Sequence, residues 1–576
     1  MKKNIVLLFN KLIIPTIIYY SFLKVVMISN YNILTTLSFI IFVIGYNKIL
    51  LINKEYIKKY GTISLILGLI YIIGDSAFQA YQNPNIMFTD VILSFDTLYK
   101  IISSVSLIYL AVSNLYQLYD KKTKAKKYKI SDKKFAIISF ILIFLSFVIY
   151  FIAFFPGIMT PDSISELEFA IYNFPYFSNH HPLLHTLFIS LFYKVGMLLF
   201  NSRNIAVSIV TLAQMIIMAS ILSYSIYFLR KRRCNDYILI VILLIYMFIP
   251  VNGYYSVTMW KDVIFAGLFL LLTMTCYELY EQDENITNKI IIKFIIVSLL
   301  TLLMRNNAIY AYFIVLLGSL IIFKHNKKIT LSIISVIIMY YIITIPIFNI
   351  LKVQKSSSAE YIAIPLQQIG RIVYKDNVLS TSEKELVNKV IPYEKIKDIY
   401  DPKLSDGIKF DKDFNIEEFN KNKIEYLKLW IELVFKYPIT SVESYLISTL
   451  GYYYPNLQYW SVATDIIDNG YEIYQTNMNS KLRNIILKNQ DINRPIIGII
   501  WSTGIYIWII ILLIYYFIIK LNKKLLFIFM PTIGIWLSLM IASPVWGEFR
   551  YIYCMIIAIP FLLSVRYINE GVENER

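Results

Sequence analysis

The stretch FPGIMTPDSISELEFAIYNFPYFSNHHPLLH, residues 155–185, joins an apolar run to a segment rich in ionisable side chains. Three of the four histidines of the chain lie in it, together with Asp162, Glu166 and Glu168. Mostly apolar proteins seldom gather their scarce charged groups in one loop without a chemical reason. This stretch is therefore the first candidate for an active site.

The composition around this stretch indicates a membrane protein. Of 576 residues, 57% are hydrophobic and 16% are charged, and the mean hydropathy is +0.59. A water-soluble domain of this size could not bury so much apolar surface, so lipid must solvate most of the chain. The net charge of +17 lies in short basic clusters between apolar runs, which is typical of membrane topology and argues against nucleic-acid binding.

Apolar stretches of nearly membrane-spanning length recur along the whole chain. A helix needs roughly 20 apolar residues to cross the hydrocarbon core. We therefore expect an all-α polytopic membrane protein with about fourteen transmembrane helices. The predicted spans are Ile5–Ile28, Ile33–Ile52, Thr62–Tyr81, Leu98–Leu118, Phe135–Phe155, Ile205–Leu229, Tyr237–Pro250, Val263–Tyr280, Lys289–Met304, Asn307–Phe323, Thr330–Ile350, Ile497–Ile519, Leu525–Ile541 and Tyr551–Tyr567.

Basic clusters mark the cytoplasmic ends of membrane helices, and they fix the expected topology. All the clusters fall on one side only if Leu183–Phe200 does not cross, because otherwise Arg230–Arg233 would face outward. That segment contains Lys194 and follows Pro182, so we expect a helix lying in the outer interface. Both chain ends are then inside, and the polar motifs share the outer face.

Charge and hydropathy divide the chain into four regions. Residues 1–134 are predicted to form N-terminal transmembrane helices and a basic cytoplasmic loop, and residues 135–351 a transmembrane core with an acidic first outer loop at 156–204. Residues 352–496 are polar and mixed in charge, which predicts an extracytoplasmic, mainly helical domain. Residues 497–576 complete the chain with three transmembrane helices and a tail.

The acidic loop offers two carboxylates for chemistry. Thr160-Pro161-Asp162-Ser163 predicts a turn that opens a short helix. Asp162 could be only the N-cap, or a carboxylate at the lip of a membrane cavity that removes a proton from an acceptor hydroxyl or holds a metal ion. Glu166 is a second catalytic candidate, with a solvated helix face as its alternative role.

The histidines of the loop have three open roles. His181 and His185 are one helical turn apart and could bind a metal ion together with a carboxylate. Alternatively, His180, His181 and His185 could hydrogen-bond a substrate, or pack at the membrane interface. No cofactor motif is present, so a divalent cation, with Asp162 as its first ligand, is the one cofactor left open.

Polar motifs at the ends of predicted spans add cations and amides. Lys261-Asp262 opens a span, and Arg305-Asn306-Asn307 divides two apolar runs. A cation at that depth is costly unless it meets an anion, or unless its side chain extends to the interface. A polyprenyl phosphate has its tail in lipid and its anionic head at this level. The other motifs of this kind contain Gln367, Gln368 and Arg371, and Glu548 and Arg550.

This layout resembles the GT-C superfamily of integral membrane glycosyltransferases, which have an acidic first outer loop and an HPPL-like helix. Here the matching residues are Asp162, His181-Pro182-Leu183-Leu184 and Asn201-Ser202-Arg203. The motifs at Lys261, Arg305, Gln367 and Glu548 resemble those of an uncharacterised bacterial membrane family usually placed beside it.

The resemblance implies an inverting transfer of sugar from a polyprenyl-phosphate donor to a glycan, lipid or protein acceptor. The reaction would take place at the outer face of a bacterial plasma membrane. Asp162 would be the base or a metal ligand, and Glu166 and His181 would complete the catalytic group. Arg305, with Arg371 or Arg550, would neutralise the donor phosphate.

Two other functions remain open from the sequence alone. A flippase or transporter of lipid-linked oligosaccharides places ionisable residues near the middle of the membrane, and Asp75 is an in-span carboxylate of that kind. A polymerase or ligase of surface polysaccharide would share the transfer chemistry and differ in its acceptor.

Overall fold

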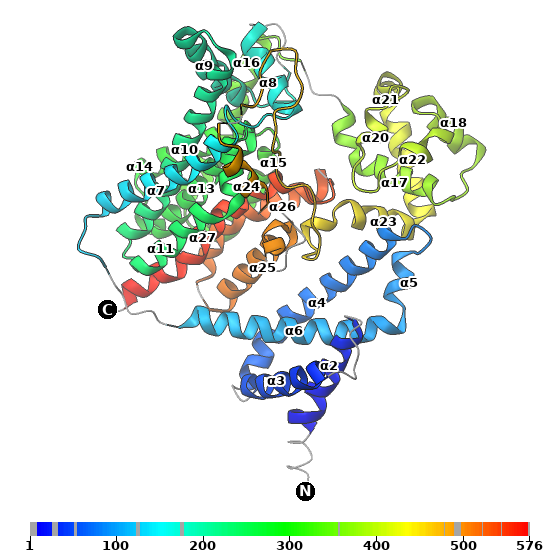
Figure 1. Cartoon of the computed structure of the whole chain (residues 1–576). Coiled ribbons are helices and arrows are strands. Elements are labelled where there is room, and N and C mark those ends of the chain that lie inside the picture. Colours follow the sequence, from blue (N-terminus) through cyan, green and yellow to red (C-terminus); the bar gives the residue numbers. More distant parts are fainter. Residues whose placement is uncertain are drawn as a thin grey trace.

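The structure, a computed structural model, describes residues 9–25, 33–50, 54–121, 127–172, 178–354, 358–476, 478–488, 497–520, 522–542 and 544–573 (Figure 1). Within these ranges the chain is helical, and extended segments meet only in isolated bridges. The ends of the two predicted spans Ile5–Ile28 and Ile33–Ile52, and the predicted boundary at residue 496, lie outside them. The chain is an all-α protein, as its hydropathy predicts.

Ten helical stretches in the described ranges are long and apolar enough to cross a membrane, which is compatible with a multi-pass membrane protein. They lie in α4 (Lys54–Gln82), α6 (Phe95–Asp120), α7 (Asp132–Ala153), α9 (Leu183–Phe200), α10 (Arg203–Lys231), α13 (Lys261–Glu281), α16 (Lys327–Ile350), α25 (Thr503–Lys520), η7 with α26 (Lys523–Phe529 and Met530–Ala542) and α27 (Phe549–Glu573).

The other predicted spans form helices outside this group of ten. They are η1 with α2 (Phe9–Ile13 and Ile14–Val25), α3 (Ile33–Leu50), α14 (Asn288–Met304), α15 (Ala308–Ile322) and the pair described next. Every stretch expected to span is thus helical where the structure describes it, and the number of fourteen crossings stays a prediction.

The predicted span Tyr237–Pro250 corresponds to α11 (Asp236–Phe248), the first helix of a bent pair. α11 and α12 (Pro250–Val257) meet at 54°, and the pair could form one further span. Pro250 lacks a backbone N–H and disfavours helical backbone at the residue before it, so α11 ends there and a new helix starts in another direction. α12 is buried and delivers the chain directly to the segment before Lys261.

α9 is the segment that we expect to lie in the outer interface. Its apolar side chains at Leu187, Leu191, Val195 and Leu198 are exposed, at spacings that place them along one side of the helix. The opposite side, with Ile189 among others, is buried against α8 and α10. Its length and hydropathy also suffice for a crossing helix, so its interfacial position stays a prediction.

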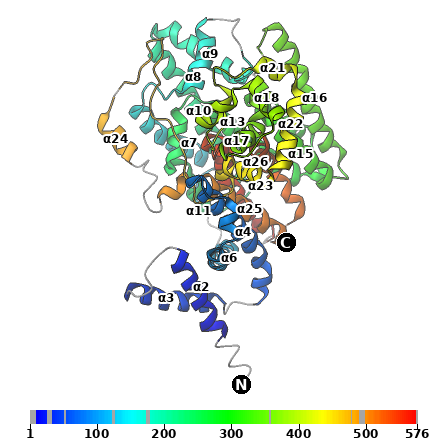
Figure 2. The same cartoon turned by 90° about the vertical axis from the view of Figure 1, so that its right-hand side faces the viewer.

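The centre of the bundle is formed by α13 and α27, which pack against each other and are largely buried. α7, α10 and α25 surround them in Figure 1. The N-terminal helices α2 and α3 lie at the far end of the molecule in both views (Figure 2). Asp120 at the end of α6 joins this N-terminal part to the bundle, since it accepts hydrogen bonds from Tyr516 and Arg566.

Short helices lie between α16 and α25, and in Figure 1 those from α17 to α22 form a group beside the bundle, whereas α24 packs against α7. They are η3 (Ser358–Ile362), α17 (Ala363–Tyr374), α18 (Thr381–Val390), η4 (Tyr393–Lys395), α19 (Ile396–Ile399), α20 (Asp406–Lys409), α21 (Ile416–Lys421), α22 (Lys423–Lys436), α23 (Pro438–Ser448), η5 (Leu450–Tyr452) and α24 (Ser480–Lys488). α17 to α22 have a hydrophobic core of their own, which includes Ile372, Val387 and Leu433. The extracytoplasmic location of this region stays a prediction.

Candidate functional site

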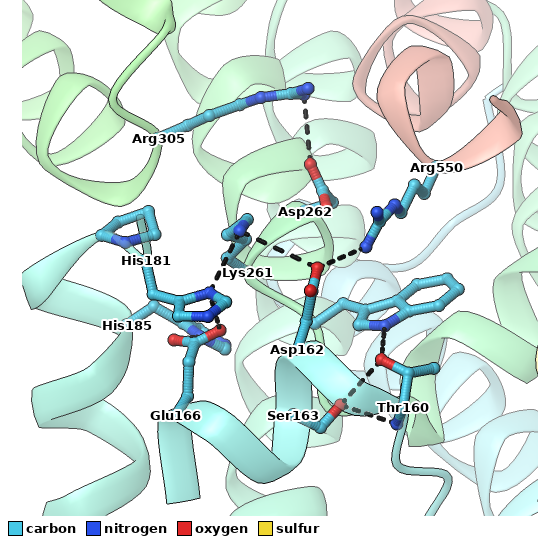
Figure 3. Close-up of polar contacts among 12 residues, drawn as sticks. Thr160, Asp162, Ser163, Glu166, His181, His185, Lys261, Asp262, Arg305 and Arg550 are labelled. Atoms are coloured by element: carbon cyan, nitrogen blue, oxygen red, sulfur yellow. Dashed lines mark hydrogen bonds and ion pairs between the residues drawn. The ribbon is translucent and has the colours of Figure 1, made fainter. Parts of the chain in front are cut away.

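Four helices begin at the polar motifs that the sequence singles out. They are α8 (Pro161–Tyr172), α13, α15 and α27, with Asp162, Lys261, Arg305 and Arg550 at or beside their first turns. The N-terminal end of a helix carries a partial positive charge. Figure 3 shows these side chains directed toward a shared space. Residues that are hundreds of positions apart therefore form one cluster, which we call the Asp162 cluster.

Two neighbouring segments hold the loop before α8 in place. Ile158 donates to Val257 O and accepts from Met259 N, at 2.8 and 3.0 Å. Met159 pairs in the same way with the segment at residues 465–467. Gly157 has φ of +152°, and a Cβ there would lie 2.5 Å from Thr211 Oγ1, so no other residue fits. The start of α8 is thus fixed against the start of α13.

Asp162 is the centre of the cluster. Its Oδ2 accepts a hydrogen bond from Arg550 Nη1 at 2.7 Å and lies 4.0 Å from Lys261 Nζ (Figure 3). The side chains of Asp162, Lys261 and Arg550 keep 27%, 15% and 19% of their surface exposed. Burial acts to raise the pKa of Asp162, but Lys261 and Arg550 outweigh it and hold this pKa well below the usual range. Asp162 is therefore an anion held between two cations that solvent can reach.

His181 lies next to these cations as a neutral imidazole. Burial, and then the Lys261 ammonium, lower the pKa of His181 to about 4. Lys261 Nζ lies 3.3 Å from His181 Nδ1, and because an ammonium can only donate, Nδ1 is the acceptor. The 3.7 Å approach of Glu166 to the same nitrogen is then no ion pair. His181 fixes the position of the Lys261 ammonium.

Glu166 and His185 form a buried pair beneath His181. His185 Nδ1 lies 2.6 Å from Glu166 Oε2, and both side chains are fully buried. Burial opposes ionisation of Glu166, but its hydrogen-bonded partner His185 and the Lys261 ammonium hold its pKa below the ordinary value. Glu166 therefore orients the histidines from behind and does not lie on a solvated helix face. His180 is exposed at the rim.

Arg305 and Asp262 lie behind the Asp162 cluster. Their charged groups approach to 3.1 Å, and the Arg305 guanidinium lies 4.9 Å from the centre of the Tyr551 ring. The alignment is too poor for a hydrogen bond, so both Asp262 oxygens and Arg305 Nη1 are buried without one. Their charges stabilise each other through proximity alone. This pair supports the starts of α13 and α15 and is nearly closed to solvent.

Glu548 stands immediately before α27. Its Oε1 lies 3.3 Å from Arg550 Nε. Burial raises the pKa of Glu548 to about 7, and Asp262, Asp162 and Asp406 act in the same direction while Arg550 opposes them. Near neutral pH, the carboxyl group of Glu548 beside Arg550 therefore changes between its neutral, protonated form and its charged, deprotonated form.

The amides beside Arg305 organise the chain and do not point into the cluster. Asn306 Nδ2 donates to the backbone and side-chain oxygens of Asn179, at 2.6 and 3.0 Å. Asn179 lies just before His180, so Asn306 fixes the histidine loop against the α14–α15 turn. Asn307 precedes α15, and its side chain does not cap that helix.

Gln367, Gln368 and Arg371 lie in α17 and belong to another network. Gln367 donates to Asp401 O, and Gln368 accepts from Trp430 Nε1 at 2.6 Å. Arg371 pairs with Glu443 on α23 at 2.6 Å, and both side chains are fully buried. The structure therefore does not bring these three residues to Asp162. A buried arginine whose charge is already matched is not available for a donor phosphate.

Breaking the Arg371–Glu443 pair is expected to destabilise the protein. Arg371→Met leaves a buried carboxylate without its main partner, which costs about 3–5 kcal/mol of unfolding free energy. We expect the lower end of that range, because Lys375 Nζ remains 3.6 Å from Glu443. Thermal unfolding of the purified protein measures the loss, and Arg371→Met combined with Glu443→Gln should recover part of it. Unchanged stability in the single variant would contradict the structural role.

Three residues at the rim of the cluster are the candidate ligands for the expected divalent cation. Asp162, His180 and His181 offer ligand atoms within 4.8 Å of one another, which is the right chemistry for a transition metal. However, the Asp162 oxygen faces Arg550 and the His181 nitrogen faces Lys261. Two resident cations would repel a third, so the arrangement fits an anion better than a metal ion.

Sequence reasoning missed the aromatic side chains of the cluster. Trp260 is buried, donates to Thr160 Oγ1 at 2.7 Å, and lies 5.4 Å from the Arg550 guanidinium. Tyr551 covers the guanidiniums of both Arg305 and Arg550. The only sequence signal was adjacency, since Trp260 precedes Lys261 and Tyr551 follows Arg550.

Comparisons with known proteins give a family but no function. No curated protein and no solved structure matches the chain significantly. A family model described as a family of unknown function, DUF6020, matches residues 172–574. The match includes Lys261, Arg305, Glu548 and Arg550 and begins ten residues after Asp162. Because it covers more than half of the chain, this protein belongs to the DUF6020 family.

Proposed function

We propose that this protein is a membrane glycosyltransferase of GT-C type, which transfers a sugar from a polyprenyl-phosphate donor to a cell-envelope acceptor. The reaction would take place at the outer face of a bacterial plasma membrane. The acceptor would be a glycan, a lipid or a protein. A polymerase or ligase of surface polysaccharide is the same chemistry with a particular acceptor.

One observation carries this proposal. Asp162 is a solvent-accessible carboxylate held between Lys261 and Arg550, at the point where several helices begin. Cations and helix N-termini together favour a phosphate group, and a carboxylate among them is placed to accept a proton. The apolar helices around the cluster would solvate the polyprenyl tail.

The resting contacts suggest an order of events. An incoming donor phosphate competes with Asp162 for Lys261 and Arg550, because both anions are attracted to the same two cations. As these cations turn to the phosphate, Asp162 loses the partners that lower its pKa and becomes a stronger base. Donor binding thus prepares the base.

The transfer step is an in-line displacement. Asp162 accepts the proton of the acceptor hydroxyl while the oxygen of that hydroxyl forms a bond to the sugar C1 carbon. The bond from C1 to the phosphate oxygen breaks, its electron pair stays on the polyprenyl phosphate, and the configuration at C1 inverts. Lys261 and Arg550 stabilise the charge of the departing phosphate, which is usually the largest catalytic contribution.

This assignment changes which cations serve the donor. The sequence suggests Arg305 with Arg371 or Arg550. Arg371 is paired with Glu443 away from the cluster, and Arg305 is nearly buried against Asp262. The partly exposed Lys261 and Arg550 are therefore proposed as the phosphate ligands, with Arg305 supporting them from behind.

The transporter alternative rested on Asp75. Asp75 is paired with Lys100 of α6 and accepts from Gln79 at 2.7 Å and from Tyr454 at 3.2 Å. These contacts join α4 to α6 and to the segment after η5. A carboxylate so occupied is better explained as a structural link than as part of a transport pathway.

The proposal is tested with the purified protein in lipid nanodiscs. A radiolabelled polyprenyl-phosphate sugar is added, and the label that leaves the lipid fraction is followed over time. We expect time-dependent release to water or to an added hydroxyl acceptor. Protein-driven movement of intact donor between the leaflets of proteoliposomes, without cleavage of the sugar, would instead favour the transporter.

Glu548 gives a prediction on pH. Above pH 7 it becomes a carboxylate next to Arg550, so we expect donor binding to weaken by about two- to tenfold between pH 6 and pH 8.5. A sugar phosphodiester keeps its single charge throughout, and titration of the protein causes the change. The dissociation constant is measured across this range, and Glu548→Gln should make it nearly constant.

The same pKa sets a trend in stability. A raised pKa in the folded state means that the folded protein retains a proton that the unfolded chain releases above pH 4.5. The contribution of Glu548 to stability is therefore full below pH 4.5 and is lost as the pH rises through 7. The donor-binding prediction is contradicted if the Glu548→Gln variant keeps the pH dependence of the dissociation constant, because another group would then cause it.

A further inference from the structure

We propose that Trp460 forms a sugar-binding subsite of the donor pocket, with its indole ring as the surface on which the sugar ring stacks. This inference rests on the proposed function and extends it from the phosphate to the sugar. The chain has seven tryptophans, and the structure describes them all. Trp460, at 47% exposure, is the only one in the exposed class.

Trp460 is connected to the Asp162 cluster through one buried ring. Its indole packs edge-on against Trp260, with 5.8 Å between ring centres. Trp260 in turn lies 5.4 Å from the Arg550 guanidinium and donates to Thr160 at 2.7 Å. Trp460 and Arg550 are therefore separated by no more than the combined length of two contacts. A sugar joined through one oxygen to a phosphate on Arg550 lies within reach of Trp460.

The backbone around Trp460 is fixed. Tyr255 OH donates to Ser461 O at 2.7 Å, and Val462 is buried. Ser461 Oγ also donates to Tyr459 O at 2.9 Å. Because the Tyr255 ring also lies 5.2 Å from the Trp260 ring, the backbone beside Trp460 is tied to the aromatic part of the Asp162 cluster. An indole held in position loses little conformational freedom when it binds a ligand.

The chemistry of a sugar ring matches this surface. One face of a pyranose presents C–H groups, which pack against an aromatic ring, while its hydroxyls stay hydrated at the rim. Exposing a large indole to water is unfavourable, so an exposed tryptophan beside a cluster of solvent-accessible charged groups marks a binding surface. The alternative role is an interfacial aromatic that contacts lipid head groups. If Trp460 contacts the sugar, its substitution weakens binding only of a lipid that carries the sugar. If it contacts lipid head groups, the loss does not depend on the sugar.

The experiment compares two lipids of equal tail length. One is a polyprenyl-phosphate sugar and the other is the bare polyprenyl phosphate. Dissociation constants are measured for the wild type, Trp460→Ala and Trp460→Phe in nanodiscs. Trp460→Ala should weaken binding of the sugar-bearing lipid about tenfold and leave the bare lipid within twofold, and Trp460→Phe should recover most of the loss. Phe435→Ala, an exposed aromatic on α22, is the matched control and should change neither constant.

Three outcomes would overturn the inference. Equal weakening for both lipids in Trp460→Ala would indicate contact with the membrane or with the phosphate, and no weakening for either would exclude a contact altogether. In both cases the proposed function stands, because the wild type still binds the donor. A wild type that binds neither lipid would defeat the proposed function together with this subsite.

Discussion

Asp162→Asn is expected to reduce sugar transfer by about 10²–10⁴-fold, the usual contribution of a general base. The substitution keeps the size and shape of the side chain and removes its ability to accept the proton of the acceptor. It also removes the negative charge that occupies Lys261 and Arg550 in the resting protein. Donor affinity should therefore stay the same or increase while turnover is lost.

That opposite change in binding and turnover makes the test specific. Release of labelled sugar gives the rate, and a direct binding measurement gives the dissociation constant for the same preparation. Glu168→Gln is the matched control, because Glu168 lies on the same helix and bonds to Tyr471 outside the cluster. If Asp162→Asn retains normal turnover, Asp162 is not the base. A simultaneous loss of binding and folding would instead identify it as a structural residue.

Arg550→Gln is expected to weaken donor binding by about 10–100-fold. Truncating one partner of a hydrogen-bonded charge pair at a binding site costs roughly 2–5 kcal/mol. We place the effect at or just below the lower end of that range, because Arg550 keeps 19% exposure and solvent screens its charge. Lys261 remains as a single point charge, which cannot replace the planar two-pronged guanidinium.

Two further variants separate charge from geometry. Arg550→Lys keeps the charge and should restore only part of the affinity. Arg203→Gln removes an exposed arginine at the start of α10, where it bonds to Tyr471 O, and should not change donor binding. Affinity measured by equilibrium binding to nanodiscs distinguishes these cases. If Arg550→Gln binds the donor as tightly as the wild type, the phosphate lies elsewhere.

The helices could be predicted from the sequence because hydropathy over some 20 residues is a local property. The end of a helix at Pro250 follows from local rules as well, but the second helix of the bent pair lies beyond the predicted span. The break matters for the site, because α12 brings the chain back to Trp260 and Lys261.

Part of the Asp162 cluster could also be anticipated. Asp162, Lys261 and Arg550 each stand at the start of a helix, and a common topology placed them on one face. A common side of the membrane does not, however, determine which of these charged side chains contact each other. The contact between Asp162 and Arg550 joins residues that are 388 positions apart. It requires both the backbone pairing of the loop before α8 with the segment before α13 and the packing of α13 against α27.

Arg371 illustrates what the sequence could not provide. It stands beside two glutamines in a motif that looks suited to a phosphate. Its partner Glu443 is 72 residues away on α23, and no local sequence pattern predicts that pairing. The tertiary fold determines which carboxylate pairs with a buried arginine. The same motif can therefore stabilise the protein or bind a substrate.

Photo-crosslinking tests most directly whether the donor head group occupies the Asp162 cluster. A polyprenyl phosphate with a diazirine next to the phosphate is bound to the full-length protein in nanodiscs, irradiated, and located by peptide mass spectrometry. We predict labels on the peptides that contain Asp162, Lys261 and Arg550, with loss of labelling when the sugar-bearing donor competes. Labels confined to the lipid-facing sides of the helices, or to α17 around Arg371, would contradict this account.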